Sequence, residues 1–223
     1  MISSDRLRRI APWARELTEP ELERAREGII ERTFSKGAFI CHRGDYLDSW
    51  TGVVSGLLKL SIFSKAGKAV TLAAIRTGGW FGAGTLMKRE RRQYDLVAMR
   101  DTQLALMDQT TFFWLFETSV GFNRFLAREF NERLGQFIAL VESERALGVP
   151  ARLARNIAWL FNPVLYPESG KHLDISQEEI GLLSGISRQS ANKALKTLER
   201  ENLLRVERGG ITILDLQKLT RYE

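Results

Sequence analysis

Cysteine and histidine are scarce in this chain, which has one cysteine and two histidines among 223 residues. Cys41 therefore has no partner for an intramolecular disulfide, and such a composition suits a reducing cytoplasm. No grouping of cysteine and histidine has the spacing of a structural zinc site or an iron–sulfur cluster. We expect no bound metal, with Cys41 as a small core residue and His42 and His172 on the surface.

Long apolar runs are missing as well. No stretch approaches the ~18 residues that a membrane-spanning helix needs, and the N-terminus lacks the apolar core of a signal peptide. The chain also lacks paired carboxylates with a plausible common pocket, a nucleophile motif and a phosphate-binding loop. The sequence thus predicts a cytoplasmic protein with no membrane partner and no catalytic residues, and the alternative of an enzyme has no motif in its support.

The composition permits two modest domains and an acidic partner. Hydrophobic residues make up 44% of the chain, which is ample for two cores, and the net charge at pH 7 is +6. A charge of this size can also simply keep a protein soluble. Because the region from Lys171 onward is close to neutral, the argument for a nucleic-acid partner depends on which face carries the charge.

Residues 174–204 have the pattern of two helices joined by a tight turn. Ser176 and Glu179 have the spacing of a capping box, which opens the first helix. Gly185 suits a left-handed break, and Ser187 can cap a second helix that runs to about Glu201. The spacing therefore predicts a helix-turn-helix.

The second helix has an apolar side and a polar side. Ala191, Leu195 and Leu198 recur on one side at helical spacing. The other side carries long polar and basic residues, which are Gln189, Lys193, Lys196 and Arg200. Since glutamine can bond adenine, and lysine and arginine can bond guanine or phosphate, this side has the chemistry of a helix that reads the major groove.

A predicted hairpin follows the second helix. Residues 203–206 and 211–214 alternate as short strands around Arg208-Gly209-Gly210, which makes the motif a winged one. The alternative is a helix pair with a hairpin that serves only packing or protein contacts. A charged outer face by itself is usually only solvated, so the prediction of nucleic-acid binding depends on the agreement of caps, turn, faces and wing.

The first hundred residues begin with helix and continue as strands. Thr18 can cap a helix from about Glu19 to Arg32. From Phe34 onward, short runs of β-branched and aromatic residues are separated by glycines, which predicts a small sandwich or barrel. Its predicted strands include residues 57–63 and 69–75, joined as a hairpin by Lys65-Ala66-Gly67-Lys68, and residues 94–98 and 103–107.

Residues 109–148 are predicted as helix, with an apolar stripe at the spacing of a coiled coil. The stripe consists of Ala127, Phe130, Leu134, Phe137 and Val141. Burying it against the same helix of a second copy would make a two-fold dimer. The open alternative is that it packs wholly against the β domain of its own chain. Gly148 and Pro150 end this helix, and a further helix follows over residues 151–168.

A β-roll, a long helix and a winged helix-turn-helix in this order resemble the Crp/Fnr family, the bacterial regulators related to the cyclic AMP receptor protein. The resemblance covers nearly the whole chain and is carried by short motifs, which are residues 39–45 (FICHRGD), 54–56 (VSG), 79–82 (GWFG), 177–181 (QEEIG) and 186–188 (ISR). It implies an α+β fold with a cyclic-nucleotide-binding-like β-roll, or jelly roll, with its N-terminal helices in residues 1–117. A dimerisation helix over 118–148 and a winged helix-turn-helix domain over 149–223 would follow.

The resemblance also implies DNA-contacting residues. The family's base contacts align with Arg188, Gln189 and Lys193, and its backbone contacts with Ser176 and Gln177. Four neighbouring polar residues complete the predicted DNA-binding set, which are Ser187, Ser190, Asn192 and Lys196. Relatives often carry an acid at the position of Gln189, so we expect the preferred half-site to differ from that of the cyclic AMP receptor protein.

The effector pocket departs from the family's pattern. Cyclic-nucleotide binders carry a glutamate and an Arg-Ser pair after the glycine turn, and these positions align with Ala83, Gln93 and Tyr94, next to Gly82. Because a cyclic phosphate would lose the bidentate bonds of the missing guanidinium, we predict that cyclic AMP does not bind usefully. The cations that can substitute are Arg89, Arg91 and Arg92, although a loop that exposes all three to water is the favoured interpretation.

Other sensors of the family fit no better. An iron–sulfur member needs several cysteines, and Cys41 and His42 would point to opposite faces of a strand rather than toward one haem iron. No cofactor is therefore predicted. Two hypotheses remain: a homodimeric regulator that binds double-stranded DNA and RNA polymerase and senses an unidentified effector in its β-roll, or an effector-independent regulator whose β-roll is a scaffold for dimerisation or partner docking.

Overall fold

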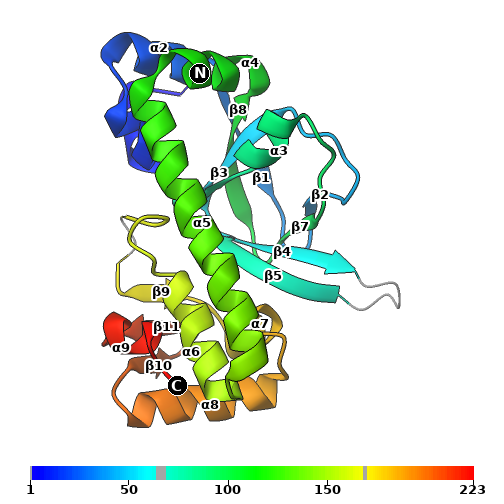
Figure 1. Cartoon of the computed structure of the whole chain (residues 1–223), viewed down its shortest axis with the longest axis vertical. Coiled ribbons are helices and arrows are strands. Elements are labelled where there is room, and N and C mark those ends of the chain that lie inside the picture. The colour runs from blue at the N-terminus through cyan, green and yellow to red at the C-terminus, as the bar shows by residue number, and fades with distance from the viewer. Residues whose placement is uncertain (1, 64–68, 168–169) are drawn as a thin grey trace. The chain divides into compact units, whose positions relative to one another are not determined.

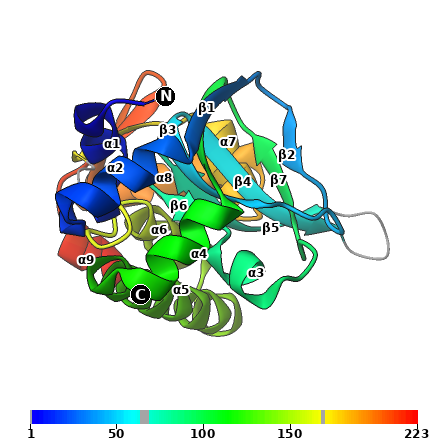
Figure 2. The same cartoon turned by 90° about the horizontal axis from the view of Figure 1, so that it is seen from above.

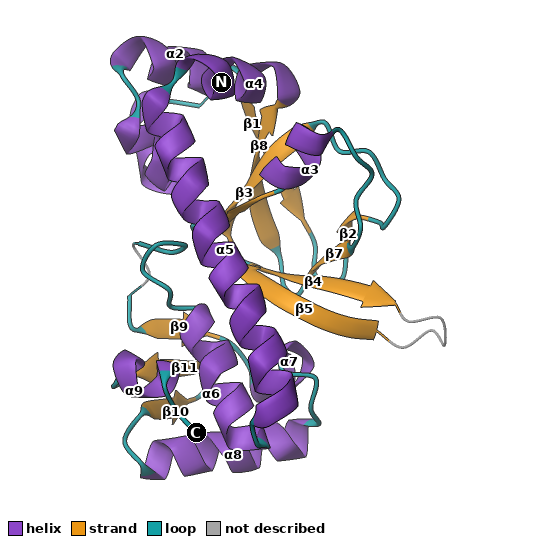
Figure 3. Ribbon diagram, in the orientation of Figure 1, coloured by secondary structure: helices purple, strands orange, loops and turns teal. Residues whose placement is uncertain are grey.

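Contacts divide the chain into two units (Figure 1). The computed structural model describes residues 2–63, 69–167 and 170–223. The N-terminal unit comprises residues 1–69 and 73–131, and the C-terminal unit comprises residues 70–72 and 132–223. The first unit combines sheets with helices, whereas most of the second unit is helical (Figure 3).

Three short helical segments open the N-terminal unit, which are α1 (Ser4–Ile10), the 3-10 helix η1 (Pro12–Glu16) and α2 (Glu19–Glu27). The predicted capping box of α2 is present, and the backbone N–H of Thr18 donates to the Glu21 carboxylate at 2.7 Å. The prediction that α2 continues to Arg32 is wrong. The helix ends at Gly28, whose carbonyl accepts from the Asp108 N–H at 2.9 Å, and the chain continues as a strand at Ile29. A Cβ at Gly28 would lie 2.4 Å from an Asp108 carboxylate oxygen, so only glycine fits this close approach.

Two four-stranded sheets form the β-roll, as the glycine-separated runs predict. The first has the order β1 (Ile29–Phe34), β8 (Thr102–Asp108), β3 (Ser49–Ser55), β6 (Trp80–Phe81). The second has the order β2 (Phe39–Cys41), β7 (Asp95–Ala98), β4 (Leu57–Phe63), β5 (Ala69–Arg76) (Figure 2). The predicted neighbours β4 and β5 are confirmed, and the turn Lys65-Ala66-Gly67-Lys68 lies outside the described residues.

An aromatic cluster forms the core of the N-terminal unit. Trp13, Trp50 and Trp80 come from η1, β3 and β6, and their ring centroids lie 4.5–5.3 Å apart. Phe112 and Phe122 pack edge-on against Trp50. Such rings stabilise a core through their large apolar area and their edge-to-face contacts. Phe113, Trp114 and Phe116 are partly buried against this core.

Three helices complete this unit and extend beyond it, which are α3 (Ala83–Lys88), α4 (Gln109–Thr118) and α5 (Val120–Ala146). The prediction of one helix over 109–148 is wrong at Ser119, whose backbone is extended. The Ser119 side chain accepts a hydrogen bond from the Phe122 N–H at 3.2 Å, and the Asn123 side chain donates to the carbonyl of Phe116 at 2.6 Å. These bonds satisfy backbone groups that an uninterrupted helix would have paired.

Besides the second half of α5, the described part of the C-terminal unit contains four shorter helices and a small sheet. The helices are α6 (Val149–Trp159), α7 (Gln177–Leu183), α8 (Arg188–Arg200) and α9 (Leu216–Thr220). The strands are β9 (His172–Asp174), β10 (Leu204–Glu207) and β11 (Gly210–Ile213), in the order β10-β11-β9. The hairpin is confirmed to within one residue, whereas β9 is not predicted because three residues are too short to show alternation.

No helix of the described chain is both long enough and apolar enough to span a bilayer.

Candidate nucleic-acid interface

Helix α8 separates its apolar and polar residues as the spacing predicts. Its N-cap is Ser187, whose hydroxyl accepts from the Ser190 N–H at 3.1 Å. The residues that face the core are at most 2% exposed, and they are Ala191, Ala194, Leu195 and Leu198. This burial anchors the helix in its unit and leaves the opposite side to solvent.

The turn before α8 is shaped by two glycines. Gly185 has φ of +64°, which confirms the predicted left-handed break between α7 and α8. Gly181, inside α7, allows close approach, because a Cβ there would lie 3.0 Å from the carbonyl oxygen of Ile186. The capping box of α7 is also confirmed, with the Ser176 N–H donating to Glu179 at 2.7 Å.

The polar side of α8 carries exposed cations. Arg188, Gln189, Lys193 and Lys196 are exposed. Among the described residues, the side chains of Arg188, Lys193 and Lys196 form no ion pair. Of the other residues in the predicted DNA-binding set, Ser187 is exposed. The remaining four are half-buried, and they are Ser176, Gln177, Ser190 and Asn192. Exposed and unpaired cations on a rigid helix can bind an anionic surface.

The wing adds two arginines that the predicted set does not include. Arg205 lies on β10, and Arg208 precedes Gly209, whose φ is +86° in the turn between β10 and β11. Both arginines are exposed. The Glu199 carboxylate on α8 accepts from the Val206 N–H at 2.8 Å and ties the wing to the helix. Their position in a hairpin directly after a recognition helix is the sequence signal that could have identified them.

The predicted effector residues meet only in part, since Gly82 and Tyr94 both adjoin the guanidinium of Arg92 whereas Gln93 is exposed. Gly82 has φ of +99° and precedes α3, and Ala83 is buried. Gln93 is exposed and donates to the carbonyl of Arg91 at 3.0 Å. Tyr94 is half-buried and accepts through its hydroxyl from Arg92 Nη1 at 3.1 Å.

Arg92 contradicts the expectation of an exposed basic loop. Arg89 and Arg91 are exposed, but Arg92 is completely buried. Its Nη1 donates to Tyr94 and, at 3.3 Å, to the Thr85 hydroxyl, while Nε and Nη2 have no hydrogen-bond partner within the described part of the chain. A Cβ on Gly82 would lie 2.5 Å from Nη2, so the guanidinium fills the space above the glycine turn.

This burial has a tertiary cause. The N–H of Arg92 donates to the carbonyl of Asp45 at 2.9 Å, and its own carbonyl accepts from Gly44 at 2.8 Å, which holds the residue against the loop after β2. The sequence pattern of residues 88–94 does not predict a contact with residues 44 and 45. The sequence therefore offered no signal that Arg92 differs from its neighbours.

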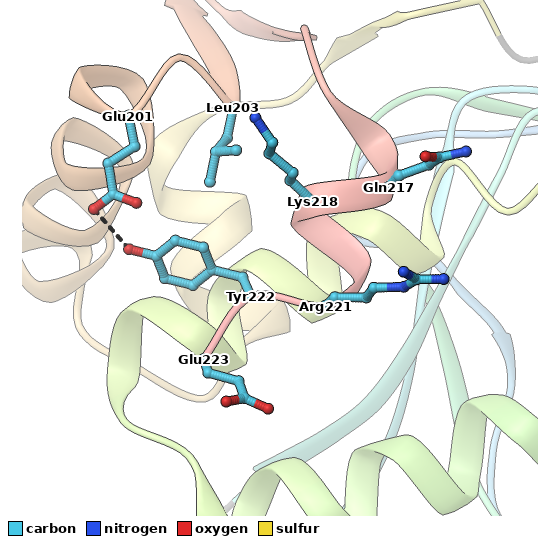
Figure 4. A pocket seen from close by; sticks show the side chains of 7 residues that line it. All are labelled: Glu201, Leu203, Gln217, Lys218, Arg221, Tyr222 and Glu223. Carbon is cyan, nitrogen blue, oxygen red and sulfur yellow. Dashed lines mark hydrogen bonds between the residues drawn. The ribbon is translucent and has the colours of Figure 1, made fainter.

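A cavity of about 520 Å³ lies in the C-terminal unit near the chain's last residues (Figure 4). It is lined by Glu201, Leu203, Gln217, Lys218, Arg221, Tyr222 and Glu223. The Tyr222 hydroxyl points toward Glu201 and donates to it at 2.8 Å (Figure 4), and burial together with this bond raises the pKa of Tyr222. None of these residues belongs to the polar face of α8.

Each of the two units contains a segment that matches a known protein family. Residues 31–119 match the model of the cyclic nucleotide-binding domain, and residues 151–222 match the Crp-like helix-turn-helix domain. The chain is 28% identical over 169 residues to the transcriptional regulator SdrP of Thermus thermophilus, covering 75% of this chain and 80% of that protein. It is 24% identical over 191 residues to the cAMP-activated global transcriptional regulator CRP of Salmonella typhimurium, covering 84% of this chain and 90% of that protein.

Solved structures share the fold. FixK2 from Bradyrhizobium japonicum superposes with a TM-score of 0.70 at 16% identity, covering 87% of this chain and 97% of that one. A mutant of CooA from Carboxydothermus hydrogenoformans gives a TM-score of 0.64 at 21% identity, with 88% of each chain covered. The predicted order of β-roll, long helix and winged helix-turn-helix is thus confirmed.

Proposed function

Because this chain belongs to the Crp/Fnr family of transcriptional regulators, and its C-terminal unit has the family's DNA-binding helix-turn-helix, we propose that it acts as a homodimer on a near-palindromic DNA site. Each copy would place the start of α8 in a major groove, with the two half-sites one helical turn, ~34 Å, apart. The observation that supports this proposal most is the polar face of α8, where three exposed cations form no ion pair with any residue that the structure describes.

The dimer would form along α5. Its stripe is exposed in the single chain, with Leu134 60%, Phe137 41% and Val141 51% exposed. Ile138, which the predicted stripe omits, is 61% exposed beside them. Apolar side chains in such a row stabilise a helix pair when a second copy covers them. Their exposure also disfavours the alternative that the stripe packs wholly against the chain's own β-roll.

Sedimentation measures this dimer directly. Leu134→Glu and Ile138→Glu should each shift the protein toward the mass of a monomer, because a carboxylate would have to be buried between the helices. Ile30→Glu is the matched control, since Ile30 is an exposed apolar residue on β1, away from the stripe. A wild-type protein that sediments as a monomer at every concentration would refute the dimer.

Selection of bound sequences from random duplexes tests the reading helix. We expect a two-fold site, and Arg188→Ala and Gln189→Ala should each weaken binding by about 1–3 kcal/mol and relax the base preference at one position. Lys196→Ala should weaken binding to all sequences alike and lower the salt dependence by about one counterion. Arg221→Ala, which removes an exposed cation next to α9, is the control. Equally tight and specific binding by both reading-helix variants would refute the assignment.

The β-roll would sense an effector that is not cyclic AMP. Ala83 and Gln93 replace the residues that the family uses for the cyclic nucleotide, and the Arg92 guanidinium occupies the space above Gly82. Two unpaired nitrogens on a buried cation favour an anionic effector, since buried charges are ordinarily paired. The alternative is that Arg92 plugs this site and the β-roll acts only as a scaffold.

Thermal unfolding with added compounds separates these alternatives. An anion that binds the β-roll and is present at a concentration 100 times its dissociation constant should stabilise the folded chain by roughly 2.7 kcal/mol. Cyclic AMP should not stabilise it. Stabilisation by cyclic AMP would refute the effector proposal, and an absence of response to phosphate, carboxylates and cyclic nucleotides would favour the scaffold.

We further propose that the protein works in the cytoplasm and contacts RNA polymerase when bound to its site. Transcription from a selected site with purified polymerase tests this, and identical transcript levels with and without the protein would count against it.

A further inference from the structure

The outer face of the wing sheet carries a polar network that the reading helix does not explain. On this face Arg205, Thr212 and His172 form one cross-strand row through β10, β11 and β9. Glu207, Gly210 and Asp174 form the next row. The residues that alternate with these on the three strands point to the opposite face of the sheet. The buried ones on that face are Leu173, Leu204, Ile211 and Ile213.

The missing side chain of Gly210 brings the two rows together. A Cβ at Gly210 would lie 2.7 Å from Cε1 and 2.9 Å from Nε2 of His172, so the imidazole lies directly over the glycine. From there Nε2 lies 3.2 Å from Asp174 Oδ1, and Nδ1 lies 2.9 Å from the Thr212 hydroxyl oxygen and 3.3 Å from Glu207 Oε2. One ring thus contacts all three strands of the wing.

All contacts around the ring are made at once only when both ring nitrogens of His172 donate. Asp174 and Glu207 are carboxylates, which only accept when ionised, and the Thr212 hydroxyl donates to Glu207 Oε1 at 2.9 Å. A neutral imidazole has one N–H, so its other nitrogen would either take the Thr212 proton away from Glu207 or present a lone pair to a carboxylate. The full network therefore fits the doubly protonated ring.

We propose that His172 is a pH-sensitive clasp of the wing, which joins β9 to β10 when it is protonated and releases Glu207 when it is neutral. Two carboxylates, Asp174 and Glu207, and two cations, Arg205 and Arg208, are the charged groups on the strands and turn around it. Protonation lowers the net negative charge of the ring and carboxylate cluster and fixes the hairpin that holds the exposed Arg208. Histidine ordinarily gains its charge between about pH 8 and pH 5.

The consequence for DNA rests on the function proposed above. A more rigid and less negative wing should bind the phosphate backbone better, so affinity for a selected duplex should rise as the pH falls. The three side chains of the clasp are 39–80% exposed, which limits the effect to that of a surface ion pair, about two- to fivefold in affinity.

Two experiments on the full chain test the clasp. In the first, duplex binding at pH 6 and pH 8 is compared for wild type, His172→Gln and His42→Gln, because His42 is the chain's other histidine and is exposed on the N-terminal unit. Wild type and His42→Gln should bind about two- to fivefold tighter at pH 6, and His172→Gln should lose this ratio. An unchanged ratio in His172→Gln overturns the proposal.

The second experiment needs no DNA. A double-mutant cycle of His172→Gln and Glu207→Gln on the thermal unfolding midpoint should show coupling at pH 6 and none at pH 8. Equal coupling at both pH values overturns the clasp. If wild type binds no duplex at any pH, the proposed function fails by itself, and the thermal cycle still decides the role of His172.

Discussion

Two short segments of this protein are built alike and use their cations in opposite ways. In each segment a glycine with positive φ precedes a helix. Gly185 precedes α8, and Gly82 precedes α3. Within the described residues, the cations of α8 are exposed and free of ion pairs, whereas Arg92, after α3, is buried with two nitrogens unpaired. The same local turn chemistry therefore leads to an exposed basic surface in one unit and to a filled interior in the other.

The two segments differ in whether the local sequence pattern predicts the exposure of a charged side chain. On α8, helical periodicity alone assigns each side chain to a face, because the apolar residues occupy one side. Around Arg92, the environment is made by residues 44, 45, 82 and 85, which reach it from separate parts of the chain.

Leu195→Ala should have the largest effect, because it removes a completely buried side chain from the apolar face of α8. A cavity of this kind lowers the free energy of unfolding by about 2–5 kcal/mol. Lys193→Ala on the exposed side of the same helix should change it by no more than ~0.5 kcal/mol. Denaturant unfolding measures both, and similar losses in the two variants would remove the distinction between the faces.

Arg92→Met tests the buried side of the comparison. Replacing an unpaired buried charge by an apolar chain of similar length should leave the protein equally stable or stabilise it by about 1–4 kcal/mol in the absence of an anionic ligand. Arg91→Met, at an exposed position, is the control. A loss of stability on replacing Arg92 would mean that its bonds to Thr85 and Tyr94 outweigh the cost of burying the charge.

Ser187→Ala should cost about 1 kcal/mol of unfolding free energy, since the hydroxyl caps the first turn of α8. Because the cap also orients the first turn that carries Arg188 and Gln189, DNA affinity should fall together with stability. Ser187→Asp, which restores a capping oxygen, should recover the thermal midpoint. If Ser187→Ala leaves that midpoint unchanged, the cap contributes nothing to the helix start.

The smallest effect concerns Cys41, which lies within the electrostatic reach of Arg92. Burial raises the pKa of the Cys41 thiol to about 11, and the charge of Arg92 opposes this rise. Since the folded state retains the proton, this contribution to stability is present below about pH 8.5 and is lost as the pH rises toward 11. Alkylation at pH 8 should thus be much slower in the folded chain than in denaturant, and equal rates would contradict the burial.

Helix caps and turns were predicted from particular residues. The pairs Thr18 and Glu21, and Ser176 and Glu179, both form capping boxes, because caps involve only residues three apart. The predictions of element boundaries were wrong where contacts with residues distant in the sequence set the boundary. The carbonyl of Gly28, where α2 ends, accepts from the N–H of Asp108, and β9 exists because β11 supplies its hydrogen bonds.

The amino-acid sequence by itself determined the order of β-roll, long helix and winged helix-turn-helix, the two faces of α8 and the apolar stripe of α5, because helical and strand periodicities are local properties of the chain. Only the tertiary structure decided that Arg92 is buried beside Gly82 and that His172 lies between Asp174 and Glu207. Each site depends on a contact between residues far apart in the chain, Arg92 with Asp45 and His172 with Glu207, and no local pattern encodes such a contact.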